Sequence, residues 1–176
     1  MTPEPSTLLD TLRQSTRAEH ERLESLTYGP KIMDGTLSVA EYRRLLDWQR
    51  RAHAALEPQV AGFRQNRYSY RPRFEPVAEP GQQITDLPRA LGILYVLEGG
   101  SLGGSVILRK LHANPALQSE APFTFYQQQA EWGVPQWRAF TKMLSSLKLS
   151  AEETERAIAG AKEAFGRFEA EWRAMP

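Results

Sequence analysis

Apolar residues recur at every third or fourth position along much of the chain, the spacing that places them on one face of an α-helix. Residues typical of helix starts stand before four of these stretches: Ser6 or Thr7 after Pro3 and Pro5, Ser38 with Glu41, Asp86 before Pro88, and Ser150 with Glu153. Another helix is expected from about Pro135, and no stretch alternates as a strand does. The pattern therefore predicts an all-α fold.

The connections between these helices differ in length. The first helix carries Thr16 and His20 on its inner stripe and is expected to end at the pair Gly29 and Pro30. Residues 62–85 contain three prolines, four arginines and little periodicity. We expect an irregular connection there, either a functional loop or a helix that the pattern hides.

The most unusual stretch is residues 91–111, an apolar run with five glycines, four of which gather within residues 99–104. Gly99 and Gly103 lie four residues apart, as do Gly100 and Gly104, so a helix would present a bare strip of backbone. A glycine inside a helix costs about 0.5–1 kcal/mol relative to alanine. We therefore expect that a flat group presses against this strip, that the chain bends there, or both.

The residues around the glycines exclude a phosphate-binding loop and a pair of membrane helices. A phosphate-binding loop needs a lysine after the last glycine, where this chain has Ser105. A membrane helix pair needs about twenty uncharged residues, whereas Glu98, Arg109 and Lys110 interrupt this run. A plain break between two helices remains open.

Composition and charge narrow the class of protein. The chain has 176 residues, of which 41% are hydrophobic and 24% charged, so a single domain over residues 1–176 is expected. A net charge of +1 gives no reason to expect a nucleic acid or a membrane as partner. Without cysteine, a metal must be held by nitrogen or oxygen. The first ten residues do not form a signal peptide, which favours a cytoplasmic location.

One histidine on an apolar helix face and one glycine-rich helix could form a pocket with two unlike walls. A planar macrocycle with a central metal fits such a pocket, because an imidazole can bind the metal from one side while bare backbone approaches from the other. Arginines near His20 and on a later helix could bind carboxylates of such a ligand. A hydrogen-bonded core histidine is the competing interpretation of His20, and His53 is a second inward-facing candidate.

Two separated motifs carry a family resemblance. The sequences LRQSTRAEHERLE (residues 12–24) and LYVLEGGSLGG (residues 94–104) closely resemble haem oxygenase, in particular its short bacterial biliverdin-producing branch. The resemblance extends to WRAF (residues 137–140) and AKEAF (residues 161–165). It implies a helical bundle with haem between a proximal helix and a glycine-rich distal helix.

The resemblance also implies roles for particular residues. His20 matches the proximal ligand of the haem iron, and Glu24 is the carboxylate one turn later. The distal catalytic wall corresponds to four glycines: Gly99, Gly100, Gly103 and Gly104. The remaining haem-binding residues implied are Arg13, Arg138 and Lys142 for the propionates and Phe165 for the pocket wall. Arg17, on the same helix as His20, is a further candidate to bind a carboxylate of the ligand.

In that family haem is both cofactor and substrate, and this implies a haem-degrading monooxygenase. O2 and electrons from a reductase or ferredoxin would convert haem to biliverdin, CO and Fe²⁺. A photoreceptor that uses biliverdin is a candidate downstream partner. Related helical folds that serve thiamin degradation or quinone-cofactor synthesis, and a purely structural bundle, are the competing classes.

The sequence departs from the family pattern in two places. The animal branch has an aspartate at the position of Gly100, where it anchors water, and the bacterial branch usually has serine. Ser101 or backbone carbonyls are candidates to replace that anchor. Without it, the alternative function is a non-catalytic haem-binding or haem-trafficking protein. The second departure is the proline-rich connection over residues 64–85.

Overall fold

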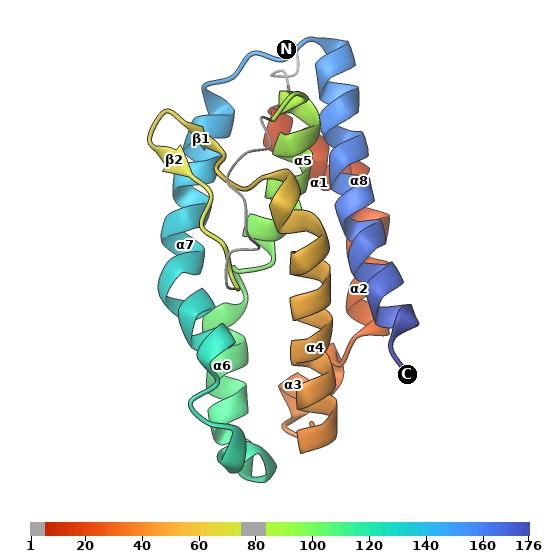
Figure 1. The fold of residues 1–176 in the computed structure, drawn as a ribbon, viewed down its shortest axis with the longest axis vertical. Helices are drawn as coiled ribbons and strands as arrows, with labels where there is room; N and C mark the ends of the chain where they lie inside the picture. Colours follow the sequence, from red (N-terminus) through yellow and green to blue (C-terminus); the bar gives the residue numbers. More distant parts are fainter. Residues whose placement is uncertain (1–5, 75–83) are drawn as a thin grey trace, which may run out of the picture.

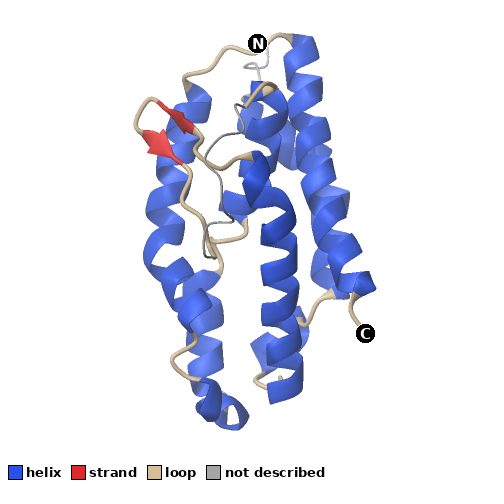
Figure 2. Cartoon of the chain, in the orientation of Figure 1, coloured by secondary structure: helices blue, strands red, loops and turns tan. Residues whose placement is uncertain are grey.

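The computed structural model describes residues 6–74 and 84–176, and almost all of its regular structure is helical (Figures 1 and 2). The helices, in chain order, are α1 (Leu8–Ser15), α2 (Arg17–Leu26), α3 (Gly29–Asp34), α4 (Val39–Leu56), α5 (Leu87–Gly99), α6 (Gly104–Ala113), α7 (Thr124–Ser145) and α8 (Ala151–Ala174). Two 3₁₀ turns, η1 (Glu57–Gln59) and η2 (Pro115–Glu120), follow α4 and α6. The predicted all-α class is confirmed.

The expected helix starts are also confirmed. Thr7 caps α1 by accepting a hydrogen bond from the Asp10 backbone, and Asp86 caps α5 by accepting one from the Arg89 backbone. The two capping boxes, at Ser38 before α4 and at Ser150 before α8, both form in full. The prolines at positions 3 and 5, expected to precede the first helix, lie outside the described residues.

Two predicted boundaries in the first forty residues are wrong. The first helix is divided at Thr16, whose backbone leaves the helical conformation and whose hydroxyl donates to the Leu12 carbonyl at 2.7 Å. This back-bonding competes with the helical ladder. Gly29 and Pro30 do not separate helices but begin α3, because a proline in the first turn has no hydrogen bond to lose.

Beyond α4, one prediction is refined and one is wrong. The connection expected to be irregular, residues 62–85, includes residues 75–83, which lie outside the described residues; its described part is irregular apart from a small antiparallel ribbon of β1 (Arg64–Gln65) and β2 (Tyr68–Ser69). Helix α7 begins eleven residues before Pro135, the predicted start, and the proline lies inside it. Buried aromatic side chains at Phe125 and Tyr126 anchor this first part of α7 in the core.

Helix α5 is the centre of the fold. Most of its side chains are buried, and it packs against both α7 and α8 (Figure 1). Glycines allow α5 and α8 to cross closely: a Cβ on Gly92 would lie 1.9 Å from the Ala157 carbonyl oxygen, and one on Gly160 would lie 2.2 Å from that of Arg89. The stretch Leu87–Ala113 is apolar and long enough to cross a bilayer by composition, but half of its most apolar part is buried in this core.

The glycine-rich stretch bends rather than forming one helix. Helix α5 ends at Gly99, α6 begins at Gly104, and residues 100–103 form tight turns between them. Here the Ser101 and Leu102 amides donate to the carbonyls three residues earlier, at 3.2 and 3.1 Å. Of the two outcomes expected for this stretch, the bend is confirmed. We call residues 99–104 the glycine break.

Candidate functional site

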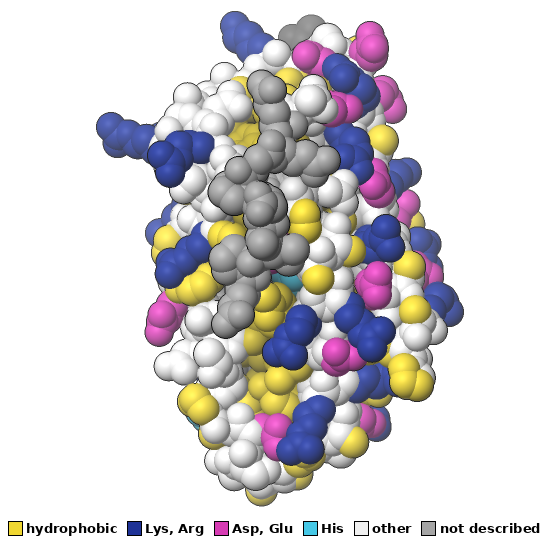
Figure 3. All heavy atoms as spheres, viewed as in Figure 1, with side chains coloured by type: hydrophobic (Ala, Val, Ile, Leu, Met, Phe, Trp, Pro, Cys, Tyr) yellow, Lys and Arg dark blue, Asp and Glu magenta, His cyan; other side chains and the backbone are white. Residues whose placement is uncertain are grey.

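A cavity of about 900 Å³ opens between α2, α4 and α8 on one side and the glycine break and α6 on the other. Its volume lies at the upper end of the range for ligand pockets. The lining is mostly apolar, and apolar side chains gather on the molecular face between α4 and α6 (Figure 3). The site therefore has room for a large, mainly apolar ligand.

His20 stands on the α2 wall of this cavity. Its side chain is 58% exposed, which differs from the buried position that the helix pattern predicted, because the cavity opens directly onto this helix face. The Nε2 atom lies 3.7 Å from a Glu24 carboxylate oxygen, and the Phe165 ring meets the imidazole edge to face at 6.0 Å. The structure thus brings together three of the predicted residues around an accessible imidazole.

The glycine break gives the cavity three positions of bare backbone, beside the side chains of Leu102 and Ile107. Gly99, Gly100 and Gly103 line the cavity, and all three could carry a Cβ without a clash: its nearest contacts would be 3.7, 3.4 and 3.7 Å away. The protein's own packing therefore does not require glycine at these positions. Gly104 differs, because it does not line the cavity and a Cβ there would lie 2.8 Å from the Cβ of Gln129 on α7.

The predicted basic residues do not all lie at the cavity. Arg13 lines it, beside the His20 wall. Arg17 is exposed and donates to Glu21 at 2.8 Å on α2, outside the cavity lining. Arg138 and Lys142 lie on α7 and do not belong to the lining residues. A role of these last three in binding carboxylates stays a prediction.

A group of polar side chains from α4 and α7 also lines the cavity: Gln49, His53, Tyr126 and Gln129. His53 donates its Nδ1 proton to the Gln49 carbonyl at 2.7 Å, which leaves Nε2 as an acceptor. Burial lowers the pKa of His53 to about 4, so this ring is neutral at pH 7.

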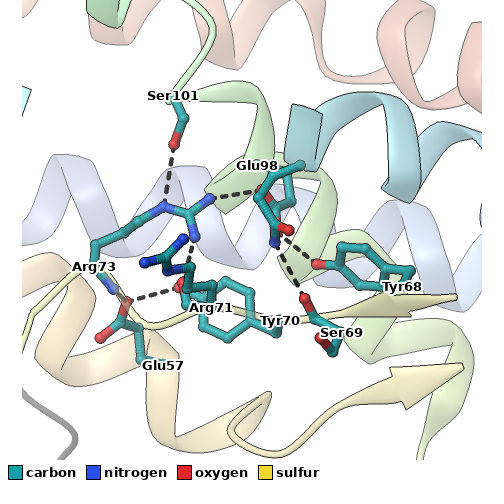
Figure 4. A network of polar contacts seen from close by, with 9 residues as sticks. Glu57, Tyr68, Ser69, Tyr70, Arg71, Arg73, Glu98 and Ser101 are labelled. Atoms are coloured by element: carbon teal, nitrogen blue, oxygen red, sulfur yellow. Dashed lines mark hydrogen bonds and ion pairs between the residues drawn. The ribbon is translucent and has the colours of Figure 1, made fainter. Parts of the chain in front are cut away.

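Sequence reasoning missed a buried polar network behind the glycine break (Figure 4). Arg73, which follows β2, donates to Glu98 at 2.6 Å and to Ser101 at 3.2 Å. The other Glu98 oxygen accepts from Tyr68 at 2.6 Å, and burial together with this carboxylate raises the pKa of the Tyr68 phenol. The richness of residues 62–85 in arginine and tyrosine was the available signal, but nothing local indicates that these side chains turn inward.

The same network holds the Ser101 side chain in place. Ser101 was a candidate to replace the missing carboxylate at Gly100, but its hydroxyl accepts from Arg73 and the residue is not among those that line the cavity. Its backbone instead packs against α7, where a Cβ on Gly133 would lie 2.4 Å from the Ser101 carbonyl oxygen. The water-anchoring role expected of Ser101 is therefore not supported by its position.

A helical bundle that encloses a large, mainly apolar cavity, lined by an accessible imidazole and by three glycines, has the features of a protein that binds a large ligand between its helices. Comparison with known proteins names the family. Residues 6–76 and 69–173 match the sequence model of heme oxygenase, and the chain belongs to the heme oxygenase family.

Two bacterial relatives agree with this assignment. The chain is 34% identical over 99 residues to "Heme oxygenase PigA" of Pseudomonas aeruginosa, an alignment that covers 53% of this chain and 48% of that protein. It is 40% identical over 78 residues to "Heme oxygenase" of Xanthomonas campestris pv. campestris, covering 44% of this chain and 46% of the relative. The match thus spans about half the length of the curated relatives.

Proposed function

We propose that this protein is a haem-degrading monooxygenase that binds haem in the 900 Å³ cavity and cleaves it to biliverdin, CO and Fe²⁺. The observation that carries the proposal is the pairing of walls: an accessible His20 imidazole faces a wall of three glycines that the protein's own packing does not require. Family membership supports the same activity.

The residues of the cavity fit haem. An imidazole nitrogen of His20 would hold the iron, and Glu24, 3.7 Å from this ring, would orient the imidazole. Phe165 would pack against the porphyrin, and Arg13 would attract a propionate. Gly99, Gly100 and Gly103 would let the distal backbone approach the ring face.

When bound, haem supplies an iron centre that accepts electrons and activates O2, and its own ring is the substrate. The protein's part is to exclude bulky groups from the distal face and to supply protons through water. Gln49, His53, Tyr126 and Gln129 provide donors and acceptors along the cavity, so they can order water there. We infer that these side chains replace a carboxylate at Gly100.

A spectroscopic titration tests the proposal. Purified protein is titrated with hemin, and a reducing system is then added in air with catalase present. Loss of the Soret band, growth of a broad red biliverdin band and release of CO are expected. A Soret change that does not saturate would contradict haem binding in this cavity.

A second candidate function is storage or transfer of haem without turnover. It is favoured by Gly100, because in the described part of the chain the only acidic residues that line the cavity, Glu21 and Glu24, lie on the α2 wall. A stoichiometric Soret band that survives the reductant would support this candidate. The electron donor, a biliverdin-using photoreceptor and a cytoplasmic location stay predictions.

A further inference from the structure

The glycine break forms part of the cavity wall, yet its own backbone hydrogen bonds restrain its conformation only weakly. Glycine adopts more backbone conformations than any other residue, and the bonds within the break are of the short 3₁₀ type, such as Ser101 to Glu98 at 3.2 Å. Contact with Gly133 restrains one side of the break. A second restraint is needed to select one shape for the wall.

Arg73 supplies that restraint. Its guanidinium donates from Nη2 to Glu98 Oε2 at 2.6 Å and from Nε to Ser101 Oγ at 3.2 Å. These two partners flank Gly99 and Gly100, so one planar group spans the pair of glycines that lines the cavity (Figure 4). The side chains of Arg73 and Glu98 are 1% and 0% exposed, so solvent does not weaken the pair.

The position of Arg73 is itself fixed. Its backbone amide donates to Glu57 at 2.7 Å, and Glu57 also accepts from the Tyr70 hydroxyl at 2.7 Å. On the far side, Glu98 accepts from Tyr68 at 2.6 Å and from Gln136 at 3.3 Å. The segment after the β1–β2 ribbon is thus tied to η1, α5 and α7 at once.

We propose that Arg73 is a positioning residue that clamps the glycine break and so sets the shape of the wall facing haem. This inference rests on the proposed function, because the wall matters only if a ligand occupies the cavity. It assigns a role to the segment where the sequence departs from the family pattern. Lysine would not replace Arg73, because a single ammonium lacks the fork that reaches both Glu98 and Ser101.

The test compares the parent chain with the double variant Arg73→Met/Glu98→Gln. The double variant removes both charges of the Arg73–Glu98 pair together and keeps an acceptor for Tyr68, while Glu57 keeps its hydrogen bonds from the backbone amide of residue 73 and from the Tyr70 hydroxyl. Arg73→Lys is the conservative second variant. Tyr70→Phe is the matched control, because it removes a bond within the same network without touching the break.

Hydrogen exchange in haem-free protein measures the clamp directly. The Gly100 and Ser101 amides, which donate at 3.0 and 3.2 Å, are expected to exchange about tenfold faster in the double variant, while amides of α8 are unchanged. Tyr70→Phe is expected to leave the two amides protected. Unchanged exchange at the break, or an equal acceleration throughout the chain, would overturn the clamp.

Haem dissociation then links the clamp to the cavity. Transfer of hemin to an excess of apomyoglobin is expected to be about tenfold faster from the double variant than from the parent, with Arg73→Lys between them. Faster exchange at the break with unaltered hemin dissociation would overturn the positioning role. Failure of the parent itself to bind hemin would overturn the proposed function, whereas the exchange result would still decide whether Arg73 restrains the break.

Discussion

His20 and His53 lie on different walls of one cavity and differ in the properties that decide whether an imidazole binds a metal. His20 is exposed to the cavity, and its ring lies beside a carboxylate. His53 is enclosed by the rings of Phe74, Phe125 and Phe168 at centroid distances of 5.4–5.9 Å. Access therefore favours His20 as the iron ligand.

Substitution of each histidine separates the two candidates. His20→Ala is expected to abolish the absorption spectrum of imidazole-ligated haem, whereas His53→Ala is expected to retain it. The measurement is a hemin titration of both variants, with circular dichroism to show that each is folded. The reverse pattern would assign the iron to His53.

The burial of His53 also predicts how stability depends on pH. Its pKa is lowered from 6.5 to about 4 in the folded chain, so below pH 6.5 the unfolded chain binds the additional proton more readily. The neutral His53 therefore contributes about 3 kcal/mol to the free energy of unfolding above pH 6.5, and this contribution is lost as the pH falls toward 4. Urea unfolding of the parent and of His53→Gln at pH 7 and pH 4.5 measures it. An equal loss of stability in the two chains would mean that His53 titrates normally.

At the scale of the elements, the four glycines of the glycine break lie in two different environments. Gly99, Gly100 and Gly103 face the cavity and meet no close protein atom, whereas Gly104 lets α6 approach α7. One sequence motif therefore contains two kinds of glycine. The space beside three of them is open to a ligand, whereas the space beside the fourth is filled by α7.

Alanine at two adjacent glycines tests this division. Gly103→Ala is expected to leave the free energy of unfolding unchanged or to raise it by about 0.5 kcal/mol, and to weaken hemin binding. Gly104→Ala is expected to lower the free energy of unfolding by about 2 kcal/mol, because the new Cβ would lie 2.9 Å from the backbone nitrogen of Ala130. Thermal unfolding and hemin titration measure the two effects. Unaltered hemin affinity in Gly103→Ala and in the larger Gly103→Leu would show that this glycine does not face haem.

The crossing of α5 and α8 is the least tolerant contact between elements. A Cβ at Gly92 would lie 1.9 Å from the Ala157 carbonyl oxygen, and backbone cannot move aside as a side chain can. Gly92→Ala is expected to lower the free energy of unfolding by about 3 kcal/mol. Gly166→Ala on α8 is the matched control, since a Cβ there meets nothing within 4 Å. Similar unfolding midpoints for the two variants would mean that the helices can separate without loss.

For the molecule as a whole, one hydrophobic cluster joins side chains from both ends of the described chain, from Leu12 to Met175. A shared core predicts that the elements unfold together. Urea unfolding followed by far-ultraviolet circular dichroism and by tryptophan fluorescence should give coincident curves. Separate transitions would show that the chain does not fold as one domain.

What the sequence predicted and what it missed follow from the range of the interactions involved. Capping boxes and helical periodicity depend on neighbours three or four residues apart, and they located the starts of α4, α5 and α8 correctly. The division at Thr16 and the early start of α7 depend on packing that has no local pattern. The pair of Arg73 with Glu98 joins residues 25 positions apart, so only the folded chain reveals it.

The site was predicted to a similar extent. Motif resemblance selected His20, Glu24, Phe165 and Arg13, which the structure gathers at one cavity. It could not separate Gly104 from the remaining glycines, because that distinction depends on how closely α7 approaches. It also passed over Gln129, since a glutamine has no chemical signature in a sequence.

Because there is free space at Gly100, a single substitution there can add a new functional group to the cavity. A side chain introduced there would start 3.4 Å from the Val96 carbonyl and 3.7 Å from that of Leu97, and would extend from the wall of the cavity. Divergence between a haem store and a haem-degrading enzyme could therefore proceed through one residue without rebuilding the bundle. The same position offers a place to graft a carboxylate by design.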